Sequence, residues 1–152
     1  MSETLSRPTY KTFTERAPDV YAGLSALTKA VDASGLEKGL TELVKLRASQ
    51  INGCVFCLKV HLGVARKAGV PQDKLDLLAT WHDAGIFSER EQAALAYAEA
   101  LTVLDGEAAS DEAWGALREE FTQDEAVYLT VTIASINAWN RIGIALRFAP
   151  PA

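Results

Sequence analysis

The chain has 152 residues, of which 49% are hydrophobic and 23% charged, a composition typical of one globular domain and not of a disordered chain. Fifteen Lys and Arg residues against 20 Asp and Glu give a net charge of −5 without a basic run, which argues against nucleic acid as a partner. Neither an apolar signal segment nor an uncharged run of membrane-spanning length is found, so no membrane partner is expected. We predict a single domain over residues 1–152, with residues 1–10 as a flexible arm, in the cytoplasm.

Apolar side chains at helical spacing predict an all-α fold with about six to seven helices. The first predicted helix spans residues 18–33. The second spans residues 36–50 and ends at Asn52-Gly53, a pair that accepts the left-handed conformation common at helix C-termini. The third spans residues 54–68, and Pro71 suits the first turn of the fourth.

Capping boxes begin two helices in the second half of the chain. The segments Ser88–Glu91 and Thr122–Glu125 start helices that we expect to reach residues 104 and 147, and a shorter helix is expected over residues 110–120. Residues 126–136 are apolar almost all round, which is typical of a helix in a core or a subunit interface. We therefore expect the chain to form a homo-oligomer.

The two cysteines of the chain are three residues apart, and a histidine follows them on the same helix. Cys54, Cys57 and His61 share one helix face, and His61 lies one turn after Cys57. Cys54 falls at the helix start, where free N–H groups and the helix dipole favour an anion. A thiol there loses its proton more easily, and the two sulfurs are close enough to close a disulfide.

Three interpretations of this spacing stay open from the residues alone. The cysteines could be small buried apolar residues beside a surface histidine. They could bind a metal with His61 and Glu42, although structural zinc sites mostly take a second ligand pair from a separate segment. The position at a helix start and the shared histidine favour the third interpretation, a redox-active dithiol, particularly in a compartment that keeps thiols reduced.

The segment from Glu42 to His61 resembles the core motif of the alkylhydroperoxidase D family, within the carboxymuconolactone decarboxylase-like superfamily. Its pattern is a glutamate, a Cys-x-x-Cys pair twelve residues on, and a histidine four residues after the second cysteine. The similarity continues through residues 65–69, the Trp81 segment and residues 88–98, and more loosely through residues 136–141. Most of the chain is covered, so the resemblance implies an all-α fold and a homo-oligomer, often a trimer or hexamer.

The resemblance implies thiol-dependent reduction of hydroperoxides, with no cofactor bound by the chain. Cys57 would attack the peroxide and Cys54 would resolve the sulfenic acid to a disulfide. Helix position alone favours Cys54 as the more acidic thiol, whereas the neighbouring histidine favours Cys57. His61 and Glu42 would form a proton relay, and an external dithiol, on a lipoyl-bearing or thioredoxin-like partner, would supply electrons. This chemistry needs an ionised thiol, a proton for the leaving oxygen and a second thiol against over-oxidation.

One position departs from the family pattern. The best-understood members have a second histidine directly before the second cysteine, and this chain has Phe56 there. An aromatic ring makes the surroundings of the thiol less polar and raises its pKa. We expect a slower peroxidase, or one suited to a bulkier apolar hydroperoxide.

Two other functions compete with the peroxidase. A non-catalytic redox sensor or stress-response oligomer would oxidise the same dithiol once without turnover. A carboxymuconolactone decarboxylase-type enzyme needs no cysteine pair, so Cys54 and Cys57 count against it. His82 is expected to be solvated or to cap a helix end, and Asn140 and Arg141 either line the site or form a structural network. The tryptophans are expected to be core or interface residues: Trp81, Trp114 and Trp139.

Overall fold

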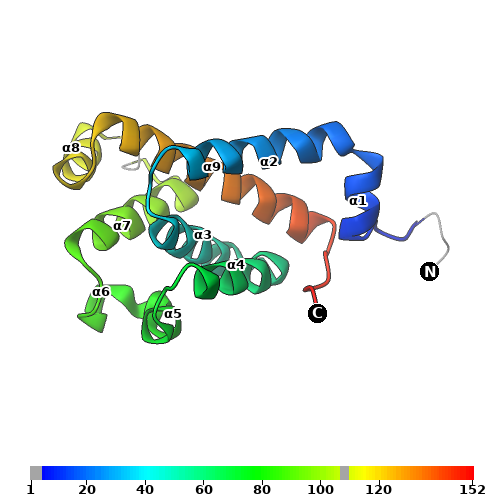
Figure 1. Ribbon diagram of the computed structural model, residues 1–152, viewed down its shortest axis with the longest axis horizontal. Coiled ribbons are helices and arrows are strands. Elements are labelled where there is room, and N and C mark those ends of the chain that lie inside the picture. The colour runs from blue at the N-terminus through cyan, green and yellow to red at the C-terminus, as the bar shows by residue number, and fades with distance from the viewer. Residues whose placement is uncertain (1–4, 107–109) are drawn as a thin grey trace.

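The computed structural model describes residues 5–106 and 110–152, and these residues form one all-helical domain (Figure 1). The predicted all-α class is confirmed, with more helices than the six or seven expected. The helices are α1 (Tyr10–Arg16), α2 (Pro18–Ala33), α3 (Lys38–Asn52), α4 (Val55–Lys67), α5 (Gln72–Leu77), α6 (Trp81–Ala84), α7 (Glu89–Val103), α8 (Asp111–Glu120) and α9 (Gln123–Ala145), with a 3-10 turn, η2 (Leu78–Thr80).

Helix α3 lies in the centre of the fold, in contact with α4, α7 and α9. Its apolar residues fill two core clusters, one with Leu40 and Val44 and the other with Leu43 and Leu46. Because α3 is covered on several sides, its polar side chains are buried as well: Thr41, Glu42, Lys45 and Ser49. Buried polar groups need partners within the protein, and those of α3 supply one half of the candidate site described below.

Local sequence signals fix several helix ends. Both predicted capping boxes are present, with Ser88 and Glu91 at the start of α7 and Thr122 and Glu125 at the start of α9. Gly53 ends α3 with φ at 74°, in the left-handed region that a residue without Cβ adopts freely. The chain therefore reverses in one residue, and α4 returns alongside α3.

Two short helices, α1 and α6, have no counterpart among the predicted elements. Helix α1 has seven residues and buries none of them, so no apolar periodicity marks it. Its start is set by a side-chain cap, in which the Thr9 hydroxyl accepts the N–H of Thr12. Of the predicted arm, residues 1–4 lie outside the described part of the chain, and Arg7 donates to the carbonyl of Ala145.

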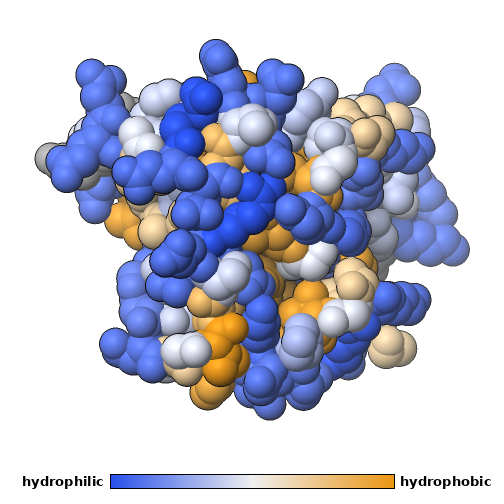
Figure 2. All heavy atoms as spheres, turned by 60° about the vertical axis from the view of Figure 1, so that its left-hand side comes forward, coloured by the Kyte–Doolittle hydropathy of each residue, from blue (hydrophilic) through white to orange (hydrophobic). Residues whose placement is uncertain are grey.

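The outer surface is mostly hydrophilic on the side of the shorter helices. Figure 2 shows small hydrophobic patches there, separated by hydrophilic side chains. Among the described residues, no helix combines the length and the apolar character needed to cross a membrane.

Candidate functional site

Helices α3 and α4 bring together the four residues predicted for the site. Glu42 lies on α3, Cys54 is the residue immediately before α4, and Cys57 and His61 lie on α4. The helix therefore starts one residue later than predicted, at Val55, with Cys54 as its N-cap. This places the first cysteine at the end of the helix where backbone N–H groups are free of helical partners.

The two cysteines form a disulfide with their Cα atoms 5.3 Å apart. The backbone N–H of Cys57 donates to the sulfur of Cys54 over 3.3 Å. Both side chains are buried, 1% and 3% exposed respectively, so a reactant must enter a cavity to reach either sulfur. A sulfur at the N-cap of a helix lies where backbone N–H groups and the helix dipole favour an anion.

A short hydrogen bond links the other two site residues, His61 and Glu42. Nδ1 of His61 lies 2.7 Å from Oε2 of Glu42, whose side chain is fully buried. The other oxygen of Glu42 accepts from Nζ of Lys45 at 3.0 Å and lies 3.2 Å from Nζ of Lys38. Lys38 also pairs with Asp32 of α2. One buried carboxylate thus pairs with three basic side chains.

These partners hold Glu42 in its ionised form. Burial alone would raise the pKa of the Glu42 carboxyl, but the hydrogen bond and the charge of His61, followed by the charge of Lys45, lower it to about 2. An ionised carboxylate only accepts hydrogen bonds, so the proton between the two groups belongs to Nδ1 of His61. In the neutral imidazole, Nε2 then carries the lone pair and can accept a proton.

Cys57 and His61 open onto a cavity of about 390 Å³ between α1, α2, α4 and α9. Aromatic rings from four helices line it: Tyr10 of α1, Tyr21 of α2, Phe56 of α4 and Trp139 of α9. Tyr10 lies 4.9 Å from Phe56 between ring centroids, and Phe148 lies 5.4 Å from Phe56. The full lining is Tyr10, Tyr21, Ser25, Thr28, Lys29, Phe56, Cys57, Val60, His61, Trp139 and Pro151.

Cys54 lines a different cavity, of about 460 Å³, at the C-terminal end of α9. Gly53 and Val55 contribute to its walls beside Cys54, and Ile144 and Arg147 do so from the other side. His61 does not line this cavity. Cys57 and Cys54 therefore line two different cavities that share Phe56, and only the cavity of Cys57 is also lined by His61.

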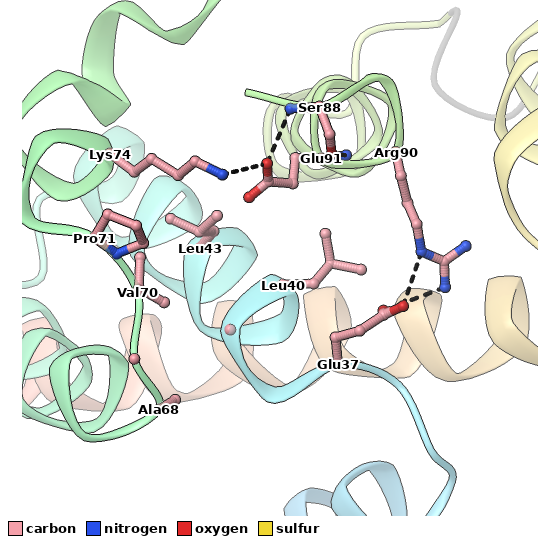
Figure 3. A pocket seen from close by; sticks show the side chains of 12 residues that line it. Glu37, Leu40, Leu43, Ala68, Val70, Pro71, Lys74, Ser88, Arg90 and Glu91 are labelled. Atoms are coloured by element: carbon pink, nitrogen blue, oxygen red, sulfur yellow. Dashed lines mark hydrogen bonds and ion pairs between the residues drawn. The ribbon is translucent and has the colours of Figure 1, made fainter. Parts of the chain in front are cut away.

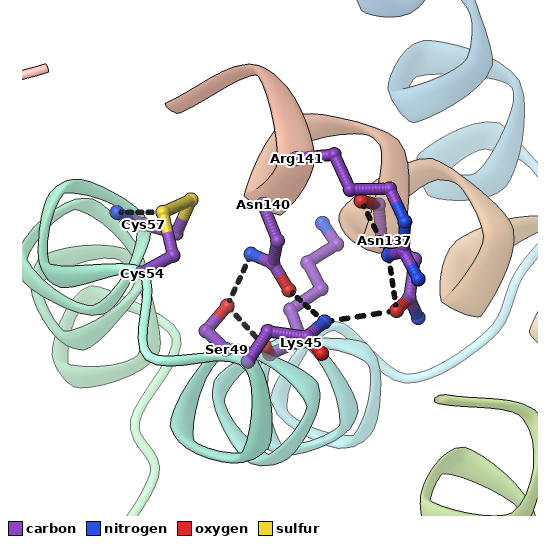
Figure 4. Close-up of a disulfide and its surroundings, with 8 residues drawn as sticks. Lys45, Ser49, Cys54, Cys57, Asn137, Asn140 and Arg141 are labelled. Atoms are coloured by element: carbon purple, nitrogen blue, oxygen red, sulfur yellow. Dashed lines mark hydrogen bonds between the residues drawn. A yellow bond between two sulfur atoms is a disulfide. The ribbon is translucent and has the colours of Figure 1, made fainter. Parts of the chain in front are cut away.

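Helix α9 packs against the disulfide, and it can approach the two sulfurs closely because residue 143 is a glycine. A Cβ at this position would lie 3.2 Å from the sulfur of Cys54 and 3.7 Å from that of Cys57. Asn140, one turn earlier, is fully buried and donates to the hydroxyl of Ser49, while its oxygen accepts from Asn52 (Figure 4). Asn140 thus belongs to a structural network between α3 and α9.

Arg141 and the three tryptophans have different roles. Arg141 donates to the backbone and side-chain oxygens of Asn137 and does not line the cavity of Cys57. Trp81 is a core residue, as expected, and Trp114 is 38% exposed. Trp139 lines the cavity of Cys57, a role that its sequence context does not indicate.

A third cavity, of about 320 Å³, lies between the start of α3, the start of α5 and the start of α7 (Figure 3). Its charged side chains are already paired, since Lys74 bonds Glu91 at 2.7 Å and Arg90 bonds Glu37. These ion pairs tie helices together and leave no reactive group facing the space. We therefore interpret this cavity as part of the packing between helices and not as a reactive site.

His82 lies outside the site. It stacks on Trp81 and its Nε2 lies 3.2 Å from Glu99, which also accepts from the indole of Trp81. Within the described ranges, no group of three or more His, Cys, Asp and Glu side chains is arranged to hold a metal ion. In this oxidised state the two sulfurs bond each other and His61 bonds Glu42, so the four residues form a disulfide beside a histidine–carboxylate pair.

Comparison with known proteins identifies the class. The model of the carboxymuconolactone decarboxylase family matches residues 18–100, and the chain belongs to that family, in its alkylhydroperoxidase D-like branch. The match covers the helices from α2 to α6 and most of α7, and so includes all four predicted site residues.

Individual relatives extend the similarity over most of the chain. The uncharacterized protein YdfG of Bacillus subtilis is 34% identical over 132 residues, which are 87% of this chain and 90% of YdfG. A protein of unknown function from Agrobacterium tumefaciens, described as a candidate antioxidant defence protein AhpD, is 36% identical with a TM-score of 0.86, over 92% of this chain and 96% of that one. The debrominase Bmp8, solved in complex with 2,3,4-tribromopyrrole, shares the fold at 22% identity and a TM-score of 0.79, over 91% of this chain and 74% of Bmp8.

Proposed function

We propose that this protein is a thiol-dependent hydroperoxide reductase in which Cys57 attacks the peroxide. The observation that carries the proposal is the shared cavity of Cys57 and His61, with His61 held by Glu42. The fold and the family support a peroxidase-related function in general. Cys57 lines one cavity and Cys54 lines another, which supports separate roles for the two cysteines.

The first step uses the groups of the aromatic cavity. The thiolate of Cys57 attacks the outer oxygen of the hydroperoxide, the O–O bond breaks, and the sulfur becomes a sulfenic acid. The departing alkoxide takes a proton, which His61 supplies as a general acid after it has accepted the thiol proton. Glu42 holds the imidazole in one orientation and stabilises its positive charge during the transfer.

The second step closes the disulfide. The thiol of Cys54 attacks the sulfur of Cys57, the S–O bond breaks, and water leaves. An external dithiol then reduces the disulfide and is itself oxidised to a disulfide. The net reaction converts one hydroperoxide and one dithiol into one alcohol, one water and one disulfide.

The reductant enters on the side of Cys54 in this proposal, because its cavity is separate from the one that holds the peroxide. A lipoyl-bearing or thioredoxin-like protein is the expected donor, since each presents a dithiol on an accessible arm or surface. Val55 and Ile144 are 58% and 44% exposed beside this opening and offer an apolar landing surface.

We also propose that the chain assembles with copies of itself through α7 and α9. A groove of about 450 Å³ there is lined by Leu101, Leu104 and residues of α9 that face away from the core, among them Ala134 and Ala138. Leu104 is 67% exposed, a large apolar area for a lone subunit. Sedimentation of the wild type and of Leu104→Glu tests this, with dissociation expected for the variant alone.

Consumption of cumene hydroperoxide, with dihydrolipoamide or reduced thioredoxin supplied in excess, tests the proposed function. The wild type should turn over many times, Cys57→Ser should be inactive, and His61→Ala should be strongly impaired. Formation of one disulfide per chain without turnover, with either reductant, would favour the redox sensor. Cysteines that resist oxidation altogether would rule out dithiol chemistry at this site.

Reductive dehalogenation is a second candidate, favoured by the aromatic walls of the cavity around Cys57. Phe56 and Trp139 both line this cavity and offer aromatic surface to a flat halogenated ring. A thiolate can take the halogen while the ring carbon gains a proton. Cys54 then displaces halide to give the same disulfide, so one dithiol converts one aryl halide into an arene and a hydrogen halide. Release of bromide from 2,3,4-tribromopyrrole, compared with cumene hydroperoxide reduction, separates the two activities.

A further inference from the structure

The cavity of Cys57 has a reactive end and an apolar middle. Cys57 and His61 form the reactive end, and Phe56 and Trp139 supply aromatic surface next to it. A volume of about 390 Å³ lies in the range of pockets that bind small organic molecules, about 300–1,000 Å³. The space thus accommodates far more than the hydroperoxyl group itself.

The wall formed by α2 has a polar character. Ser25, Thr28 and Lys29 lie three and four residues apart, so they occupy one side of the helix and line the cavity together. Among the described residues that line the cavity, none is an aspartate or a glutamate. An anionic group on a bound molecule would therefore meet a cation and two hydroxyls here, without a competing carboxylate.

Lys29 has no anionic partner within the described part of the chain. Neither an ion pair nor a side-chain hydrogen bond joins it to another described residue, whereas Lys38, Lys45 and Lys74 each pair with a carboxylate. Other unpaired basic residues, such as Lys59, do not line this cavity. Lys29 combines the two properties: it is unpaired and it lines the wall of the reactive space.

The phenol of Tyr10, which lines the cavity, does not supply a negative charge. Burial, followed by a hydrogen bond with Tyr21, raises the pKa of Tyr10 to about 12. Its hydroxyl is therefore neutral at physiological pH.

We propose that the substrates are apolar hydroperoxides that carry a carboxylate, with the carboxylate bound by Lys29 and the hydroperoxyl group placed at Cys57. This inference rests on the proposed peroxidase function and adds the substrate class. Fatty-acid hydroperoxides have the required form: an apolar chain for the aromatic walls, one anionic end and one reactive group. Lys29 acts as a specificity residue, since it contacts the substrate away from the reacting atoms.

A matched pair of ligands and a matched set of variants test the proposal. The ligands are the hydroperoxide of linoleic acid and its methyl ester, which differ only in the carboxylate. The variants are Lys29→Met, which removes the cation, Lys29→Arg, which keeps it, and Lys59→Met, which removes an exposed lysine of α4 outside the cavity. The KM ratio of ester to acid is measured for each, and calorimetry with the two reduced alcohols measures binding without turnover.

The wild type, Lys29→Arg and Lys59→Met should prefer the acid to the ester by about fivefold, in KM and in binding, as expected for one partly exposed ion pair. Lys29→Met should lose this preference because its affinity for the acid is weaker. Its kcat and its KM for the ester should stay the same. The preference should also shrink as salt is added. An unchanged ester-to-acid ratio in Lys29→Met, by either measurement, would overturn the proposal.

The two readouts separate this proposal from the proposed function. Turnover of both hydroperoxides with a ratio that ignores Lys29 would reject the carboxylate preference and leave the peroxidase standing. Binding of the acid alcohol that depends on Lys29, with no turnover of either hydroperoxide, would support the anion site and reject the peroxidase.

Discussion

Nδ1 of His61 lies 2.7 Å from Oε2 of Glu42, and this bond joins α4, which carries the histidine, to the buried helix α3. Because Glu42 is ionised, the bond fixes which nitrogen of His61 carries the proton and leaves Nε2 for chemistry. His61 also lines the cavity that contains Cys57. The fully buried carboxylate of Glu42 thus determines which nitrogen of the partly exposed His61 carries the proton.

Removal of either member of this pair should slow the oxidation of Cys57. His61→Gln should lower the second-order rate constant for cumene hydroperoxide by about 10²-fold, the usual contribution of a general acid–base. Glu42→Gln should have a smaller effect, about tenfold, because it releases the imidazole without removing it. Stopped-flow measurement of disulfide formation gives both values. Equal, undiminished rates in the two variants would exclude the relay.

The ionised Glu42 should also govern stability in acid. Its pKa is about 2 in the folded protein against an ordinary 4.5, so it contributes stability above pH 4.5 that is lost as the pH falls towards 2. The contribution is at most about 3 kcal/mol. Urea unfolding of the wild type should show this loss, and Glu42→Gln should lack that part of the slope. The exposed Glu119→Gln should follow the wild type, and a Glu42→Gln curve parallel to the wild type would contradict the assignment.

Gly143 should be intolerant of a methyl group although it lies within a helix. The new Cβ of Gly143→Ala would lie 3.2 Å from the sulfur of Cys54, and overpacking of this kind costs about 1–3 kcal/mol. Gly63→Ala is the matched control, since nothing lies within 4 Å of its Cβ position, and alanine should stabilise α4 by up to about 1 kcal/mol. Thermal unfolding of the oxidised variants should therefore give shifts of opposite sign. A stabilised Gly143→Ala would show that α9 can move away from the disulfide.

Much of the scaffold was predictable because its signals are local. The boxes at Ser88 and Thr122 each satisfy free N–H groups within four residues, so the sequence alone identifies these helix starts. Cys57 and His61 are one turn apart on α4, and helix geometry places them together without tertiary information. The contact of Glu42 with His61 followed from the family resemblance, since helix periodicity does not relate α3 to α4.

The walls of the cavity were not predictable from such signals. Tyr10 belongs to a short helix with no fully buried residue and no apolar periodicity, yet its half-buried ring packs on Phe56. Lys29 looks like an ordinary exposed residue of an amphipathic helix until the fold places it at the same cavity as Cys57. The burial of Lys45 likewise depends on α3 being covered from several sides, and that is a property of the tertiary structure.

The most direct test of the central claim, that Cys57 attacks the hydroperoxide, is to trap its sulfenic acid. Cys54→Ser is treated with one equivalent of cumene hydroperoxide in the presence of dimedone, and the adduct is located by mass spectrometry. We predict the adduct at Cys57, at a rate close to that of wild-type oxidation, and no rapid adduct at Cys54 in the reciprocal Cys57→Ser variant. A rapid adduct at Cys54 in Cys57→Ser, with an unreactive Cys57 in Cys54→Ser, would contradict the assignment and give the attack to the other sulfur.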